Sequence, residues 1–167
     1  MTWRTMLTGG LCVLGLAAGS DAQAPRRALF PDATQYLTVQ PVPLPTPVAR
    51  GRRATLTLEV TPNPGMHIYA AGAHDVVPVT LAAHPPAGIT VGRPRYSAPD
   101  VAQAPGAVAA APAYRRPFRI TVPVTIGAGV SPGILTVPAE VQYQACDERL
   151  CYPSVTATTL WTLSVSR

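Results

Sequence analysis

The stretch that decides the fold runs from residue 118 to residue 126 and reads FRITVPVTI. Its apolar members occupy every second position: Phe118, Ile120, Val122, Val124 and Ile126. A period of two places alternate side chains on opposite faces of an extended chain, which predicts a half-buried β-strand. The same alternation recurs in residues 54–60, 135–145 and 155–165. These four segments predict a protein built on strands that each bury one face.

Three shorter apolar segments, residues 66–70, 76–81 and 89–91, complete the predicted strands. Pro78 places the second of them at an edge or a bulge, because proline has no backbone N–H to donate. Turn residues separate the segments, as in TPNPG at residues 61–65. About seven short strands without a helical period are typical of an immunoglobulin-like antiparallel β-sandwich. The predicted fold class is therefore all-β.

The composition agrees with this fold and excludes other classes. The 167 residues include 20 Pro and 13 Gly, which helix interiors tolerate poorly. The hydrophobic fraction of 47% is too high for a chain that is disordered throughout. The net charge of +5 is small, and two Phe and two Trp offer little surface for base stacking. We therefore expect no nucleic-acid partner.

Residues 1–22 are interpreted as a secretory signal peptide. Arg4 supplies the positive charge, Met6–Ala18 is the apolar run, and Ser20-Asp21-Ala22 offers small residues for cleavage near Ala22. The run is shorter than the roughly 20 residues of a transmembrane helix, and a retained N-terminal anchor is the alternative. We expect an exported, periplasmic protein.

The mature chain is predicted to begin with a Pro-rich arm, residues 23–50, followed by the sandwich domain, residues 51–167. Prolines at every second position from Pro41 to Pro47 favour an extended, polyproline-like arm over a packed element. Within the domain, the Ala-, Pro- and Gly-rich residues 97–113 predict a long loop, of a kind that is often functional or disordered.

Two cysteines, Cys146 and Cys151, remain once Cys12 leaves with the leader. Four residues separate them at the tip of a predicted hairpin, so the thiols can meet across a turn. A structural disulfide is one interpretation, since disulfides persist in exported proteins. Closing a six-residue ring restricts the unfolded chain by only about 2 kcal/mol, however. A ring at an accessible tip is also more easily reduced, so a redox-active pair is the second interpretation.

The segments around the pair resemble a known family. Tyr143-Gln144-Ala145-Cys146 and Cys151-Tyr152-Pro153 resemble the redox motif of the N-terminal periplasmic domain of DsbD, the thiol:disulfide interchange protein. Gly65-Met66-His67-Ile68-Tyr69 resembles that domain's early Gly-x-x-x-Tyr strand. The resemblance covers about residues 52–165.

The resemblance implies an immunoglobulin-like sandwich with thiol-disulfide oxidoreductase activity and no cofactor. Its pair, Cys146 and Cys151, would take electrons from a membrane-embedded thiol reductase of the DsbD or CcdA type. It would pass them to periplasmic thioredoxin-like or other thiol proteins, without a small-molecule substrate. By analogy with the family we expect Cys146 to be attacked more often than Cys151. The residues expected to shield the pair or bind partners are His67, Tyr69, Tyr96, Tyr143 and Tyr152.

A non-enzymatic binding module is the alternative hypothesis. In it the disulfide only shapes a loop, and the Pro-rich arm or residues 97–113 contact a partner. No metal site is expected on either hypothesis, because His67, His74 and His84 are scattered and match no standard zinc spacing.

Overall fold

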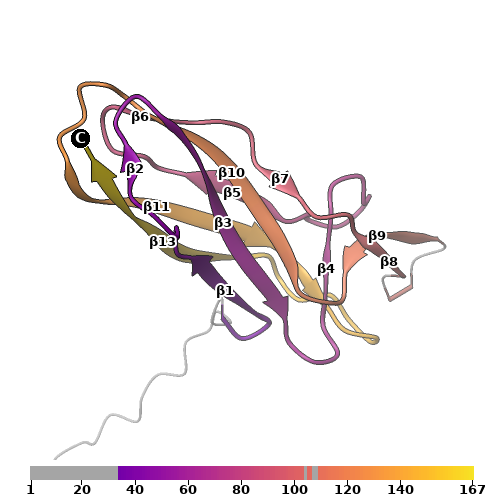
Figure 1. Cartoon of the computed structure of the whole chain (residues 1–167). Coiled ribbons are helices and arrows are strands. Elements are labelled where there is room, and N and C mark those ends of the chain that lie inside the picture. The colour runs from indigo at the N-terminus through magenta and orange to yellow at the C-terminus, as the bar shows by residue number, and fades with distance from the viewer. Residues whose placement is uncertain (1–33, 104, 107–108) are drawn as a thin grey trace, which may run out of the picture.

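Three sheets account for the strands of the computed structural model, which describes residues 34–103, 105–106 and 109–167 (Figure 1). The predicted signal peptide and the part of the predicted arm before residue 34 lie outside the described residues. In chain order the strands are β1 (Leu37–Val42), β2 (Val48–Ala49), β3 (Arg53–Pro62), β4 (His67–Tyr69), β5 (Thr80–Ala83), β6 (Ile89–Val91), β7 (Arg95–Tyr96), β8 (Asp100–Gln103), β9 (Ala110–Tyr114), β10 (Phe118–Ile126), β11 (Gly133–Tyr143), β12 (Ala145–Cys146) and β13 (Val155–Ser166).

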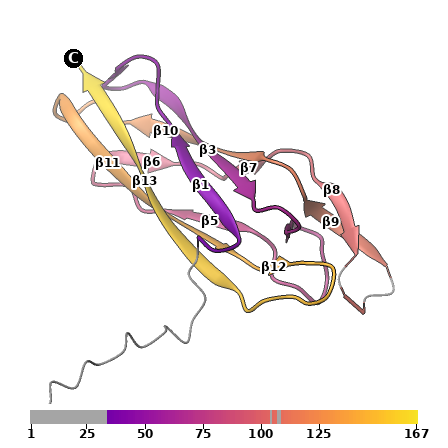
Figure 2. The ribbon, with the colours of Figure 1, turned by 90° about the horizontal axis from the view of Figure 1, so that it is seen from below.

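Two sheets form the sandwich. One has the order β1-β3-β10-β6, with β7 also paired to β10, and the other has the order β2-β13-β11-β5. A third sheet, β12-β4-β9-β8, extends one end of the sandwich (Figure 2). The described pairings are antiparallel except for β2 with β13, which is parallel. The predicted immunoglobulin-like antiparallel sandwich is confirmed.

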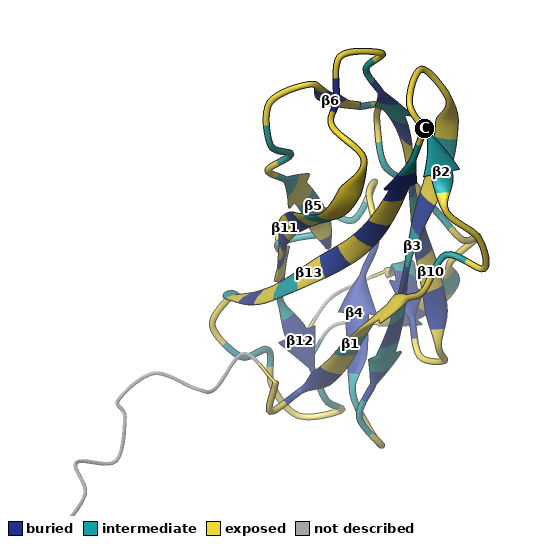
Figure 3. Cartoon of the chain, turned by 60° about the vertical axis from the view of Figure 1, so that its left-hand side comes forward, coloured by how far each residue is buried: buried dark blue, intermediate teal, exposed yellow. Residues whose placement is uncertain are grey.

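The main core lies between the two large sheets and follows from the alternation in the sequence. Every second residue of β10 is buried from Phe118 to Ile126. The same alternation gives β13 its bands of buried and exposed residues (Figure 3). Trp161 of β13 is 2% exposed, and its Nε1 donates a hydrogen bond of 2.8 Å to the carbonyl oxygen of Thr57 on β3. This bond ties one sheet to the other across the core.

The strands predicted from strict alternation are confirmed, and β10 has the predicted bounds. The strand predicted over residues 76–81 is shifted, since β5 begins only at Thr80. Within the part of the chain that the structure describes, no helix is long and apolar enough to span a membrane.

The prediction of an unpacked arm is wrong for residues 37–42. They form β1, which pairs with β3 from Leu37 opposite Pro62 to Val42 opposite Thr57. Leu37 is fully buried in the main core. β1 lies at the edge of its sheet, and proline is tolerated there because its missing N–H leaves no gap in an inner ladder.

The prediction of a loop over residues 97–113 is also wrong. Residues 100–103 and 110–114 form the hairpin β8–β9, with Asp100 opposite Ala113 and Gln103 opposite Ala110. β9 also pairs with β4. Alanine and proline have low strand propensity, so pairing with β4 and packing at this end of the molecule outweigh local preference.

Candidate functional site

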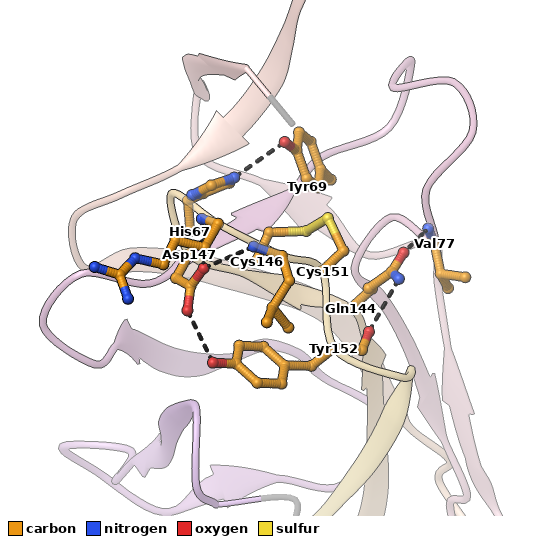
Figure 4. The surroundings of a disulfide bond; sticks show 10 residues. His67, Tyr69, Val77, Gln144, Cys146, Asp147, Cys151 and Tyr152 are labelled. Carbon is orange, nitrogen blue, oxygen red and sulfur yellow. Dashed lines mark hydrogen bonds between the residues drawn. A yellow bond between two sulfur atoms is a disulfide. The ribbon is translucent and has the colours of Figure 1, made fainter. Parts of the chain in front are cut away.

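The cysteine pair closes a six-residue ring at the tip that follows β12. Cys146 and Cys151 are joined by a disulfide with their Cα atoms 4.0 Å apart (Figure 4). The Asp147 N–H donates to the Leu150 carbonyl oxygen at 3.0 Å, and the Tyr152 N–H donates to the Ala145 carbonyl oxygen at 2.9 Å. These two bonds hold the ring as a tight turn, as the four-residue spacing predicts.

The side chain of Asp147 organises the inside of this turn. Its Oδ1 accepts hydrogen bonds from the backbone N–H groups of Arg149 at 2.7 Å and Leu150 at 2.8 Å. Its Oδ2 accepts one from the Tyr152 hydroxyl at 2.8 Å. The backbone bonds, followed by the tyrosine bond, lower the pKa of Asp147 below its usual value. The group is therefore a carboxylate at neutral pH, and its charge disfavours a thiolate on the adjacent Cys146.

The disulfide packs in a small cluster of its own, apart from the main core. Its buried members are Tyr69, Ala102, Ala113 and Cys146, and the partly buried side chains around them are Ala73, Val76, Ala111 and Cys151. They come from β4, the segment after it, the β8–β9 hairpin and the cysteine ring. The hairpin thus covers one side of the disulfide.

The two cysteine residues differ in their access to solvent. Cys146 is fully buried, whereas Cys151 is partly exposed. Arg149 and Leu150, which precede Cys151 in the ring, are exposed, and Leu150 keeps 47% of its surface in solvent. The ring therefore forms the exposed side of the cysteine pair.

His67 and Tyr69 of β4 lie against the buried half of the disulfide. His67 is the β-sheet partner of Cys146, and its Nε2 lies 3.0 Å from the Tyr69 hydroxyl (Figure 4). Both side chains are buried. Burial lowers the pKa of His67, with a further lowering by Arg115 and an opposing effect of Asp147. Burial raises the pKa of Tyr69, so both groups are neutral at pH 7.

Two further contacts anchor the base of the ring. The Tyr152 ring stacks on Tyr36 with a centroid distance of 4.5 Å. The Gln144 side chain donates from Nε2 to the Tyr152 carbonyl oxygen at 3.0 Å and accepts at Oε1 from the Val77 N–H at 2.9 Å. The cysteine ring is therefore fixed to Tyr36, just before β1, and to the segment before β5.

Residues 33–163 match the family described as the N-terminal part of the thiol:disulfide interchange protein DsbD. The chain belongs to this family. No curated protein sequence matches the chain. Thiol–disulfide exchange is accordingly the role of this DsbD N-terminal domain, with the Cys146–Cys151 disulfide as the feature that such chemistry requires. Its partners in general are thiol proteins, and the family is periplasmic.

Two solved structures have similar architecture. The DsbD N-terminal domain of Neisseria meningitidis in its reduced form is 14% identical with a TM-score of 0.49, over 81% of this chain and 90% of that one. A family 123 glycoside hydrolase from Clostridium perfringens is 10% identical with a TM-score of 0.39, over 78% of this chain and 28% of that one. The family assignment rests on the family match and not on these likenesses.

The five side chains predicted to surround the cysteines separate into two groups in this DsbD N-terminal domain. His67 and Tyr69 lie beside Cys146, and Tyr152 is bonded to the ring through Asp147. Tyr143 is fully buried in the main core. Tyr96 pairs with Ile120 on β10 and packs against the main core. The structure therefore does not bring Tyr96 and Tyr143 into the disulfide cluster.

Sequence reasoning missed the residues that shape the site without resembling a motif. Asp147 is one of them, although an Asp at the first position of a tight turn is a signal for side-chain bonds to the backbone two and three residues on. The sequence did not indicate that Ala102 and Ala113 belong to the site, because the small side chain of alanine is compatible with many positions. Among the described residues, no group of three or more His, Cys, Asp or Glu side chains is placed to hold a metal ion.

Proposed function

We propose that this domain relays electrons through the Cys146–Cys151 pair, from a membrane-embedded reductase of the DsbD or CcdA type to periplasmic thioredoxin-like or other thiol proteins. The observation that carries the proposal is the position of the disulfide. It lies outside the main core, with one cysteine residue partly exposed and the other buried. Such a bond can open at its exposed end while the two large sheets stay packed.

Reduction begins with attack by a thiolate of the electron donor on Sγ of Cys151. The bond between the two cysteines breaks, Cys146 leaves as a thiolate, and a mixed disulfide joins the donor to Cys151. A second thiolate of the donor then attacks the donor sulfur of this mixed disulfide. The disulfide of the donor forms, and Cys151 leaves as a thiolate. Two electrons have then moved to the domain, and the reverse sequence passes them to an oxidised acceptor.

This assignment reverses the expectation that Cys146 is attacked more often. A thiolate attacks along the axis of the disulfide and must approach the sulfur it bonds to. Cys146 is enclosed by Tyr69, Ala102 and Ala113, whereas Cys151 borders solvent. We assign the mixed disulfide to Cys151 and the resolving role to Cys146.

Export is part of the proposal. A signal peptide at residues 1–22, cleaved near Ala22, would deliver the domain to a compartment where the disulfide can form. His67, Tyr69 and Tyr152 are proposed to shield the pair or to bind partners, because they lie at the disulfide cluster or on the cysteine ring.

Trapping with oxidised glutathione tests the exchange. In Cys146→Ser the exposed thiol remains and no resolving thiol is present, so we expect a stable mixed disulfide on Cys151, detected by mass spectrometry. In the matched variant Cys151→Ser we expect little or none. The reduction potential of the native pair, measured in thiol buffers, is expected near or above roughly −250 mV. A potential below roughly −300 mV would indicate a structural disulfide and the alternative binding module.

A further inference from the structure

Reoxidation of the domain requires a thiolate at a place that does not favour one. When the mixed disulfide on Cys151 is resolved, Cys146 must attack as a thiolate. Cys146 is fully buried, and the Asp147 carboxylate follows it directly in the chain. Burial and a neighbouring negative charge both favour the protonated thiol. The resolving step therefore needs a nearby group that takes the proton.

His67 is placed for this task. It is the antiparallel partner of Cys146 in the pairing of β4 with β12, and directly opposed residues have Cβ atoms roughly 5 Å apart on the same face of a sheet. His67 is 2% exposed, and it is the polar side chain that appears among the buried residues of the described chain. A titratable ring therefore lies buried opposite Cys146.

The contact with Tyr69 orients the imidazole ring. The Nε2 atom lies 3.0 Å from the Tyr69 hydroxyl, and a ring nitrogen held in this way determines where the other nitrogen points and which tautomer is favoured. When Nε2–H donates to the tyrosine oxygen, Nδ1 carries the lone pair that can accept a proton. Tyr69 packs in the same cluster as Cys146, so it holds the ring of His67 at the end of the molecule where the disulfide lies.

The charges that surround His67 keep the ring neutral. Arg115 follows β9 on one side of β4, and Asp147 follows β12 on the other. Burial and Arg115 together outweigh Asp147 and hold the pKa of His67 below 6.5. At pH 7 the imidazole is therefore free to accept a proton, which an already protonated ring could not do.

We propose that His67 accepts the proton of the Cys146 thiol when Cys146 resolves the mixed disulfide, and that Tyr69 is its positioning residue. The inference rests on the exchange proposed above. The proton passes from Sγ of Cys146 to the imidazole, and the resulting thiolate attacks Sγ of Cys151. The disulfide of the domain forms, the partner sulfur leaves as a thiolate, and the imidazolium returns its proton to that thiolate or to water. In the reducing direction the donor thiol gives its proton to the imidazole as it becomes the attacking thiolate, and the imidazolium passes that proton to Cys146 as it leaves.

The test measures the resolving step directly. Reduced protein is mixed with oxidised glutathione between pH 5 and pH 9, quenched in acid, and the glutathione adduct and the disulfide form are followed by mass spectrometry. For the native protein we expect a resolution rate that rises as His67 loses its proton and is level around neutral pH. For His67→Gln we expect a rate about 10²-fold lower at pH 7, rising tenfold per pH unit. Tyr69→Phe is expected to fall between the two. His74→Gln, at an exposed position in the loop after β4, is the matched control with the native profile.

Each result bears on one of the two proposals. If His67→Gln forms the adduct and resolves it with the native rate and pH profile, His67 is not the acceptor and the exchange itself stands. If no protein forms an adduct on Cys151, the proposed exchange fails. Should His67→Gln not fold, the reduced native protein supplies the answer by NMR with ¹³C-labelled cysteine. The Cβ signal of Cys146 is expected to shift as His67 titrates, and the absence of that shift overturns the inference.

Discussion

Reduction of the Cys146–Cys151 bond is expected to cost the domain about 2 kcal/mol of unfolding free energy and to leave it folded. The bond joins residues five apart in sequence, so it removes little entropy from the unfolded chain. The main core between the two large sheets contains neither cysteine. At about 4 °C per kcal/mol for a domain of this size, the melting temperature falls by about 8 °C.

Urea unfolding followed by circular dichroism, with and without dithiothreitol, measures this difference. The double variant Cys146→Ser with Cys151→Ser is the control, and its stability should be the same under both conditions. A reduced protein that loses its strand signal without denaturant would refute the reasoning. It would mean that the small cluster around the disulfide supports the sheets, as a structural disulfide in a binding module would.

Two other predictions concern the neutral buried histidine and the bond between the sheets. Because the folded pKa of His67 lies below its unfolded value of 6.5, the unfolded state binds more protons as the pH falls. The stability that depends on neutral His67 is complete above pH 6.5 and is lost as the pH falls through the lowered folded pKa. Urea titrations at pH 8 and pH 5 should show this loss of unfolding free energy. The variant His67→Gln should show a smaller loss. Trp161→Phe leaves the Thr57 carbonyl oxygen without its donor and should lower the unfolding free energy by about 1–3 kcal/mol. The rate at which the glutathione adduct is resolved should stay native. An unchanged denaturation midpoint would contradict the expected loss of stability.

Local patterns were sufficient for the strands that bury one face. Along β10 the alternation from Phe118 to Ile126 is uninterrupted, and the strand has the predicted bounds. β1 was missed because its prolines resemble a polyproline segment, although an edge strand accepts them. The β8–β9 hairpin was missed because its stability comes from β4 and the disulfide cluster. The strand propensity of alanine does not indicate such contacts.

The candidate site, like the fold, was predicted where local sequence indicated it and missed where it depends on long-range contacts. The spacing of Cys146 and Cys151 indicated a disulfide, and the family resemblance indicated its chemistry. The relative exposure of the two cysteine residues was not available from the sequence, since Cys146 packs with Ala102 and Ala113 from strands that were not predicted. The proposal that Cys151 is attacked departs from the sequence-based expectation at this point.

The missed hairpin is therefore the element on which the order of the exchange depends. With β8 and β9 absent, Ala102 and Ala113 would no longer enclose Cys146, and both sulfur atoms could meet a partner. With the hairpin in place, the proposal has the partly exposed Cys151 form the bond to the partner and the buried Cys146 resolve it. The same burial makes a thiolate at Cys146 unfavourable, and this is why we propose the neutral His67 opposite it as the proton acceptor. Small side chains suit this position because they enclose the sulfur closely without entering the main core, so the redox change stays confined to the end of the sandwich.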